Sequence, residues 1–144
     1  MIAPDEHPDP RPGQGIIRAS WIATAILTIS DAAAALGPEE LLVPGAIVAI
    51  ALFLLGCGLF VGAWVIAANR SRTETVDLYG LVFVSGVGPK RVQRHLVGSL
   101  LVQCALVVTC ATVRPATAAG ILAPVAGLGF SALWAARHGE FRRR

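Results

Sequence analysis

Residues 41–68 read LLVPGAIVAIALFLLGCGLFVGAWVIAA, a stretch of 28 residues that contains no Asp, Glu, Lys or Arg. A helix needs roughly 20 predominantly apolar residues to cross the hydrocarbon core of a bilayer. A surface helix of a soluble domain would carry a polar face over this length, and this stretch carries none. It therefore predicts a membrane-spanning helix.

The rest of the chain contains similar stretches. Residues 96–113 and 115–136 are also without charged side chains, and residues 16–36 carry only Arg18 and Asp31. An arginine near a helix end can extend to the headgroups, and a carboxylate costs about 2.5–3.5 kcal/mol at most on insertion scales. The sequence therefore predicts an all-α membrane protein, a four-transmembrane-helix bundle with spans at residues 16–36, 42–68, 96–113 and 117–136.

Composition and charge agree with this interpretation and indicate an orientation. Apolar residues make up 55% of the chain and charged residues 15%, against about 25% charged in soluble domains. Eleven of the twelve Lys and Arg residues lie in or beside residues 1–15, 69–95 and 137–144, and only Arg114 lies on the opposite side. Because Lys and Arg are enriched in cytoplasmic segments, we predict a multi-pass protein of the cell inner (plasma) membrane with both termini cytoplasmic, N-in and C-in.

The segments outside the membrane domain, residues 16–136, are short. Residues 1–15 are acidic and proline-rich, which predicts a disordered cytoplasmic tail and not a signal peptide, and residues 137–144 predict a basic cytoplasmic tail. Within the cytoplasmic loop 69–95, a Ser71-x-x-Glu74 pattern suggests a capping box, and helical spacing over residues 76–84 predicts a short helix at the membrane face.

The secondary structure of residues 81–84 in this loop has two interpretations, and the end of the loop is expected to start the next helix. The β-prone residues 81–84 allow a two-stranded element in place of the short helix. Pro89 is expected to start a helix that runs without a break into the third span.

Trp21, Trp64 and Trp134 are all expected at the cytoplasmic interface, as in an aromatic belt.

Residues 85–96, SGVGPKRVQRHL, resemble the hairpin of a helix-hairpin-helix DNA-binding motif. The second helix of such a hairpin would pack on a soluble partner, whereas here it continues into an uncharged stretch. The sequence therefore argues against nucleic-acid binding, and the phosphates that this segment meets are expected to belong to anionic lipids. We predict headgroup contacts for Arg70, Arg72, Lys90, Arg91, Arg94 and Arg137.

Motifs for chemistry are not found in the sequence. Cys57, Cys104 and Cys110 form no C-x-x-C pair, and we interpret them as small apolar core residues. No histidine cluster has metal-ligand spacing, and no P-loop or nucleophile motif occurs. We therefore expect no catalytic residue, no metal site and no cofactor.

Two polar residues inside the predicted spans could have a role, Asp31 near the outer end of the first span and Gln103 in the middle of the third. A carboxylate inside a span is by default a functional candidate, here a proton or cation site in a small transporter. The alternative is an intramembrane charge pair with Arg114, which lies at the same outer level. Gln103 is expected to hydrogen-bond to another helix and to act in packing.

Small residues at helical spacing predict close helix packing. Gly58-x-x-x-Gly62 lies in the second span, and a ridge of small residues with a spacing of four follows the fourth span. Such ridges allow helix backbones to approach closely, within the bundle or between subunits. The predicted packing residues are Gly58, Gly62, Gln103, Ala119, Ala123, Gly127 and Ser131, with Ala135 continuing the ridge.

Residues 81–141 contain PKRVQRHL, Arg114-Pro115, Pro124, Gly127-Leu128-Gly129 and a segment from Trp134 to Gly139. In these motifs the chain resembles a family of uncharacterised small integral membrane proteins of high-G+C Gram-positive bacteria. The resemblance implies a membrane protein and carries no activity.

From the residues, the favoured function is a non-enzymatic structural or accessory subunit of a membrane complex. Its expected partners are the bilayer with its anionic headgroups and a protein partner or a second copy of the chain. The alternative is a small proton-coupled transporter that uses Asp31.

Overall fold

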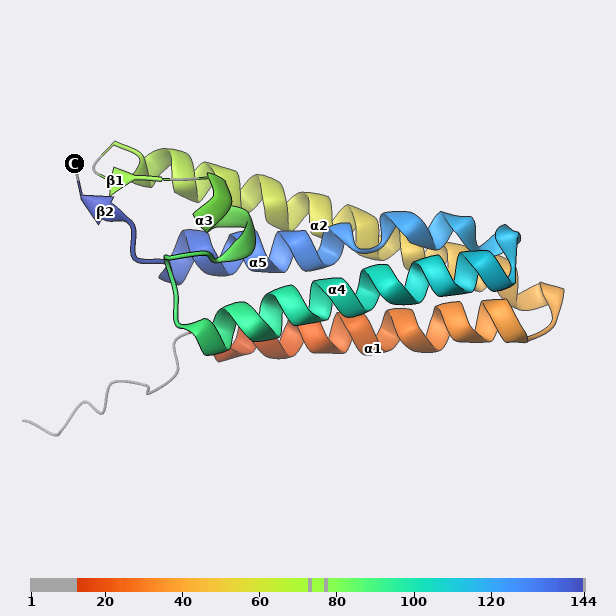
Figure 1. Ribbon diagram of the computed structural model, residues 1–144. Helices are drawn as coiled ribbons and strands as arrows, with labels where there is room; N and C mark the ends of the chain where they lie inside the picture. The colour runs from red at the N-terminus through yellow and green to blue at the C-terminus, as the bar shows by residue number, and fades with distance from the viewer. Residues whose placement is uncertain (1–12, 73, 77, 144) are drawn as a thin grey trace, which may run out of the picture.

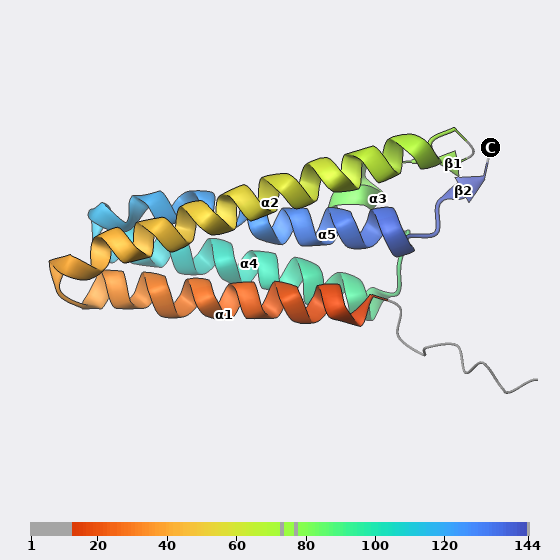
Figure 2. The ribbon, with the colours of Figure 1, turned by 180° about the vertical axis from the view of Figure 1, so that it is seen from behind.

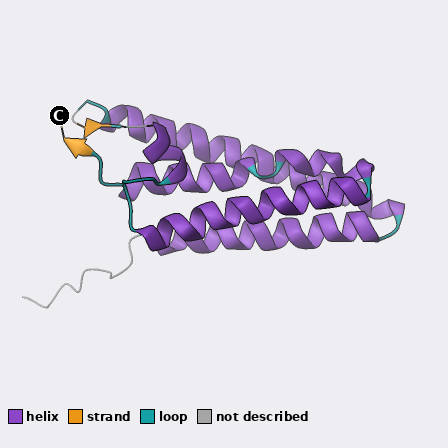
Figure 3. Ribbon diagram, in the orientation of Figure 1, coloured by secondary structure: helices purple, strands orange, loops and turns teal. Residues whose placement is uncertain are grey.

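The computed structural model describes residues 13–72, 74–76 and 78–143, and it is almost entirely helical (Figures 1 and 3). Four helical segments are long and apolar enough to cross a membrane, which confirms the prediction of an all-helical chain with four candidate spans. The described elements are α1 (Gln14–Leu36), η1 (Glu39–Leu41), α2 (Leu42–Arg70), β1 (Glu74–Thr75), α3 (Leu78–Phe83), α4 (Lys90–Val113), η2 (Pro115–Leu122), α5 (Val125–His138) and β2 (Arg142–Arg143).

The spans form two adjacent pairs. Helix α1 lies beside α4, and α2 lies beside α5, as both views of the ribbon show (Figures 1 and 2). We call one end of the bundle the N/C end, where α1 and α4 begin and α2 and α5 end. The opposite end, with η1 and the start of η2, is the loop end. Among the described Lys and Arg residues, all except Arg114 lie at the N/C end.

Helices α2 and α5 approach each other so closely that their backbones touch. A Cβ atom added at Gly56 would lie 2.5 Å from the backbone N of Ala126 and from the backbone C and O of Val125. A Cβ added at Gly129 would lie 2.5 Å from the carbonyl oxygen of Gly56. Only glycine allows this approach, so these two glycines set the separation of the helices.

The prediction that Gly58 and Gly62 of α2 pack against another helix is wrong within the bundle. Gly58 is exposed, and a Cβ at Gly58 or Gly62 would meet nothing within 4 Å. The buried face of α2 instead carries residues spaced by three, four or seven positions, which returns to one side of a helix. These residues are Gly45, Ala49, Leu52, Gly56, Ala63 and Ala67.

The fourth span is not one α-helix. Its first eight residues, η2, are wound as a 3-10 helix, and Pro124 separates them from α5. Runs of 3-10 helix longer than three or four residues are uncommon, because their hydrogen-bond geometry is poorer. Since a 3-10 helix has 3.0 residues per turn, its inward face repeats every third residue, at Thr117, Gly120 and Ala123.

This winding changes the predicted ridge of small residues. Ala123, Gly127, Ser131 and Ala135 are buried as the spacing of four requires. Ala119 is exposed, and Gly120 takes its place in the interior. A spacing of four fits an α-helix, so it fails only in the segment that is wound as η2.

The short helix predicted between α2 and α4 is present as α3 (Leu78–Phe83), which includes residues 81–83, so the two-stranded alternative for residues 81–84 is wrong. Strand β1 pairs antiparallel with β2, and the short helix α3 follows. The capping-box prediction is wrong, because Ser71 ends α2 and its hydroxyl donates to the carbonyl of Ala68 at 2.7 Å. Helix α4 runs unbroken from Lys90 to Val113, as predicted.

Several residues predicted to lie in tails belong to the fold. Helix α1 begins at Gln14 with Gly13 as its N-cap, and residues 1–12 of the predicted N-terminal tail lie outside the described residues. The C-terminal segment is anchored, because the backbone N–H of Glu140 donates to the carbonyl of Val87 at 2.8 Å and Phe141 is buried. Trp21 and Trp64 are exposed as belt residues would be, but Trp134 is 1% exposed and belongs to the core.

Candidate functional site

A polar face of α1 lies inside the bundle. Ser20, Thr24 and Asp31 are all buried, and with the buried Leu27 and Ala34 they follow one helix face. The hydroxyls of Ser20 and Ser99 on α4 share a hydrogen bond of 2.7 Å. Polar contacts between α1 and α4 therefore run through the interior.

Gln103 has the interhelical partner that its position in α4 led us to expect. Its Nε2 donates to the hydroxyl of Thr24 at 2.7 Å, and that hydroxyl donates to the carbonyl of Ser20 at 2.9 Å. Its Oε1 is buried without a hydrogen bond among the described residues and faces Gly127, where an added Cβ would lie 3.1 Å away. The bond from Gln103 to Thr24 joins α4 to α1 inside the bundle, which fits a packing role.

Asp31 lies at the loop end, where α1, α2 and η2 meet. It is 3% exposed, and its Oδ2 has no hydrogen-bond partner among the described residues. Gly120 of η2 packs directly on the carboxylate, because an added Cβ would lie 2.6 Å from Oδ2. Beside it is a cavity of about 10 Å³ that Thr117 and Gly45 help to line. A single water molecule needs roughly this volume.

The predicted charge pair between Asp31 and Arg114 is not formed within the described residues. Arg114 Nη1 donates to the carbonyl of Ala34 in the last turn of α1 at 3.0 Å and to that of its C-cap, Gly37, at 2.9 Å. Its Nη2 lies 3.9 Å from the carboxylate of Glu39, which is 92% exposed. The physical reason is that the C-terminus of a helix presents unpaired carbonyls and a partial negative charge, which bind a guanidinium without desolvating a second ion.

The arrangement around Asp31 suits the exchange of one proton. Among the described residues, no group of three or more His, Cys, Asp or Glu side chains is placed to hold a metal ion. Calcium takes six to eight oxygen ligands, and magnesium takes carboxylates with several waters. A single carboxylate beside a cavity of about 10 Å³ offers neither set, but it can bind and release a proton.

The predicted headgroup residues fall into two groups. Arg72, Lys90, Arg91, Arg94 and Arg137 are exposed at the N/C end. Arg70 is half-buried, and it donates to the carbonyls of Ala136 and Gly139, both at 2.9 Å. Its guanidinium also lies 5.1 Å from the centre of the Phe141 ring. Arg70 therefore caps α5 in the same way that Arg114 caps α1.

The three cysteines are free thiols in different environments. Cys110 is buried, Cys57 is half-buried and Cys104 is exposed. The expectation of core residues thus holds for Cys110, whereas Cys104 lies on an apolar outer face. A signal for this difference is present in the helical spacing, because Cys110 lies seven residues from the buried Gln103 and Cys104 lies one.

No protein-family model, curated protein or solved structure matches the chain. The resemblance to small integral membrane proteins of high-G+C Gram-positive bacteria therefore stays a prediction, and the function has to be argued from the site.

Proposed function

We propose that the chain is a small proton-coupled transporter in which Asp31 binds and releases the proton. The observation that carries the proposal is the unpartnered, buried Oδ2 of Asp31 between three candidate spans. A carboxylate inside a membrane segment is costly and by default marks a functional site.

The two ordinary explanations of this carboxylate are a charge pair and exposure to water. Arg114 is engaged by the carbonyls of Ala34 and Gly37, and Asp31 is 3% exposed. A charge pair therefore does not account for Asp31, and its contact with water is limited to the cavity of about 10 Å³ beside it. This reverses the order that the sequence favoured, in which an accessory subunit came first.

The element facing Asp31 also favours transport. Discontinuous helices at the depth of a buried ion site are a recurrent feature of transporters. Here η2 and α5 form such an interrupted span, with Pro124 between them and Gly120 against the carboxylate. A change in the winding of η2 would move Gly120 and Thr117 relative to Asp31 and would open or close the proton site.

The proposal includes an orientation. The basic residues of the N/C end support a cytoplasmic location for that end, with both termini inside the cell. Asp31 then lies toward the outer face of the membrane. The chain has no enzymatic role in this proposal.

Replacing Asp31 with asparagine should remove a titrating carboxyl group from the membrane interior. Asparagine keeps the shape of the side chain and cannot bind and release a proton. Infrared difference spectra of the wild type in liposomes, recorded between acidic and alkaline pH, should show the C=O stretch of a buried carboxyl. We expect this band to be absent in Asp31→Asn, together with Asp31-dependent proton entry into pyranine-loaded liposomes under an imposed membrane potential.

Glu39→Gln is the matched control, because Glu39 is an exposed acid at the same end of the bundle. It should keep the buried carboxyl band and the proton entry. A wild-type spectrum without such a band, or proton entry that persists in Asp31→Asn, would remove the proposal.

A second function is that of an accessory subunit of a membrane complex. It is favoured by the position of Gly58 and Gly62 on the outer face of α2. The pair lies on α2 with open space beyond it, while Gly56 alone of the three glycines serves the bundle. A glycine pair with a spacing of four is suited to close packing of another membrane helix. The occupant in this candidate is the α2 face of a second copy of the chain, because a symmetric dimer brings the same surface together.

Replacing both Gly58 and Gly62 with isoleucine should then dissociate a dimer seen in mild detergent. The added side chains would keep the two α2 backbones apart. The control is Gly98→Ile on α4, where an added Cβ also meets nothing within 4 Å. Native gels and crosslinking measure the change, and a wild type that is monomeric throughout would eliminate this candidate.

A further inference from the structure

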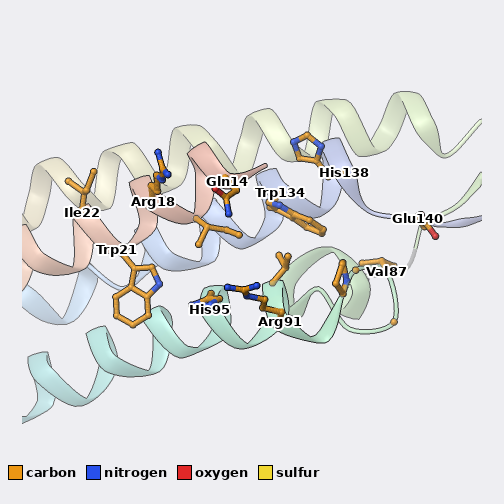
Figure 4. A pocket seen from close by; sticks show the side chains of 15 residues that line it. Gln14, Arg18, Trp21, Ile22, Val87, Arg91, His95, Trp134, His138 and Glu140 are labelled. Atoms are coloured by element: carbon orange, nitrogen blue, oxygen red, sulfur yellow. The ribbon is translucent and has the colours of Figure 1, made fainter. Parts of the chain in front are cut away.

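The N/C end contains a cavity of about 1090 Å³ that is separate from the Asp31 site (Figure 4). Its walls come from the start of α1, the turn at residues 86–89, the first turns of α4 and the end of α5. Small-molecule pockets usually measure about 300–1,000 Å³. The cavity is thus larger than a lone inorganic anion requires.

Most of the ionisable side chains on its walls are basic. Arg18 comes from α1, Arg91 and His95 from α4, and His138 from α5, whereas Glu140 is the only acid that lines it among the described residues. Figure 4 shows Arg91 and His95 close together on α4, and Arg18 on the neighbouring α1 with its side chain directed away from them. The cavity therefore favours an anionic occupant.

The start of α4 adds to the arginine and histidine side chains. Helix α4 begins at this cavity with Pro89 as its N-cap and no side-chain cap, and a helix N-terminus attracts anions. Trp134 forms part of the wall through its ring and is 1% exposed, whereas its indole Nε1 is buried against Gly13 and does not face the cavity.

The cavity also has an apolar side. Trp21 and Ile22 line it, and they are 39% and 59% exposed on the outer face of α1. Ile17 and Val92 extend this apolar lining inward. A ligand that fills the cavity therefore needs an anionic group at the start of α4 and an apolar group along α1.

We propose that this cavity binds one molecule of an anionic phospholipid, with its phosphate held by Arg91 and His95 at the start of α4. The acyl chains leave along Trp21 and Ile22. This is a single site with defined ligands, distinct from the general attraction of exposed cations to a charged membrane surface. It does not depend on the proposed function of Asp31.

The test compares two arginines on the same helix. Arg91 and Arg94 are both exposed and lie less than one turn apart on α4. Arg91 lines the cavity and Arg94 does not. The full-length chain in mild detergent is titrated with phosphatidylglycerol, phosphatidylcholine or glycerol phosphate, and the bound species are counted by native mass spectrometry. We expect one tightly bound phosphatidylglycerol per chain and much weaker binding of phosphatidylcholine.

Arg91→Gln should lower the affinity for phosphatidylglycerol about tenfold, as expected for one lost charge-assisted bond. Arg91→Lys should retain most of the affinity, and Arg94→Gln should leave it unchanged. Circular dichroism and thermal unfolding establish that each variant is folded.

Three results would overturn the proposal. An equal loss in Arg91→Gln and Arg94→Gln would mean that only general surface charge attracts the lipid. Equal affinities for phosphatidylglycerol and phosphatidylcholine would exclude an anion-selective site. Displacement of the lipid by glycerol phosphate at a similar concentration would identify the ligand as a soluble phosphate ester.

Discussion

Gly56→Ala is expected to destabilise the chain by about 3 kcal/mol or to prevent its folding, the upper end of the range for overpacked cores. The added methyl group would lie 2.5 Å from three backbone atoms of Val125 and Ala126. Backbone atoms cannot move aside as the end of a side chain can, so α2 and α5 would have to separate along their length. Unfolding in detergent micelles, followed by circular dichroism, measures the loss.

Gly58→Ala is the matched control for this variant. Gly58 lies two residues further along the same helix, and an added Cβ meets nothing within 4 Å. We expect no loss of stability, and a small gain because alanine has the better helix propensity. Equal stabilities of the two variants would show that α2 and α5 do not touch at Gly56.

Arg114→Gln is expected to lower the free energy of unfolding by about 3 kcal/mol, since two hydrogen bonds from a charged donor are lost. The guanidinium holds the carbonyls of Ala34, in the last turn of α1, and of its C-cap Gly37, and it is the only described contact of this kind at the loop end. The shorter amide of glutamine cannot span both carbonyls. Unfolding in micelles gives the difference, with the exposed Arg72→Gln as the control.

A double variant separates this role from the charge pair that the sequence suggested. If Arg114 neutralised Asp31, then Asp31→Asn would restore much of the stability lost in Arg114→Gln. Because Arg114 binds carbonyls of α1 instead, the two effects should add to within about 0.5 kcal/mol. A large rescue in the double variant would return Asp31 and Arg114 to a paired arrangement.

The candidate spans could be predicted because they depend on local properties of the chain. Hydropathy identifies four segments, and Gly37 with Pro38 ends α1 where a helix cannot continue. The unbroken course of α4 follows from the position of Pro89. None of these features depends on which helix lies next to which.

The contacts between helices could not be predicted in the same way. Gly56, Gly58 and Gly62 are equally small, and only the position of α5 makes Gly56 the packed residue. Likewise, the sequence placed Arg114 and Asp31 at one level, but it could not show that the carbonyls of α1 are nearer to the guanidinium. Choosing among such candidates requires the relative positions of the helices.

The cavity at the N/C end could not be predicted from the sequence either, although the sequence assigns other roles to two of its residues. Arg91 was expected to contact headgroups, and Trp134 was expected in an aromatic belt. The cavity arises because α1, α4 and α5 bring these side chains together from segments far apart in the chain.

The 3-10 winding of η2 changes how far the fourth span reaches. A 3-10 helix rises about 2.0 Å per residue and an α-helix about 1.5 Å, so the eight residues of η2 extend about 16 Å instead of about 12 Å. Helix α2, with 29 residues, is about 44 Å long, whereas 24 residues of α-helix would extend only about 36 Å. The stretched winding of η2 closes about half of this mismatch, and so it lets the shorter segment follow its partner α2 toward the far side of the bundle.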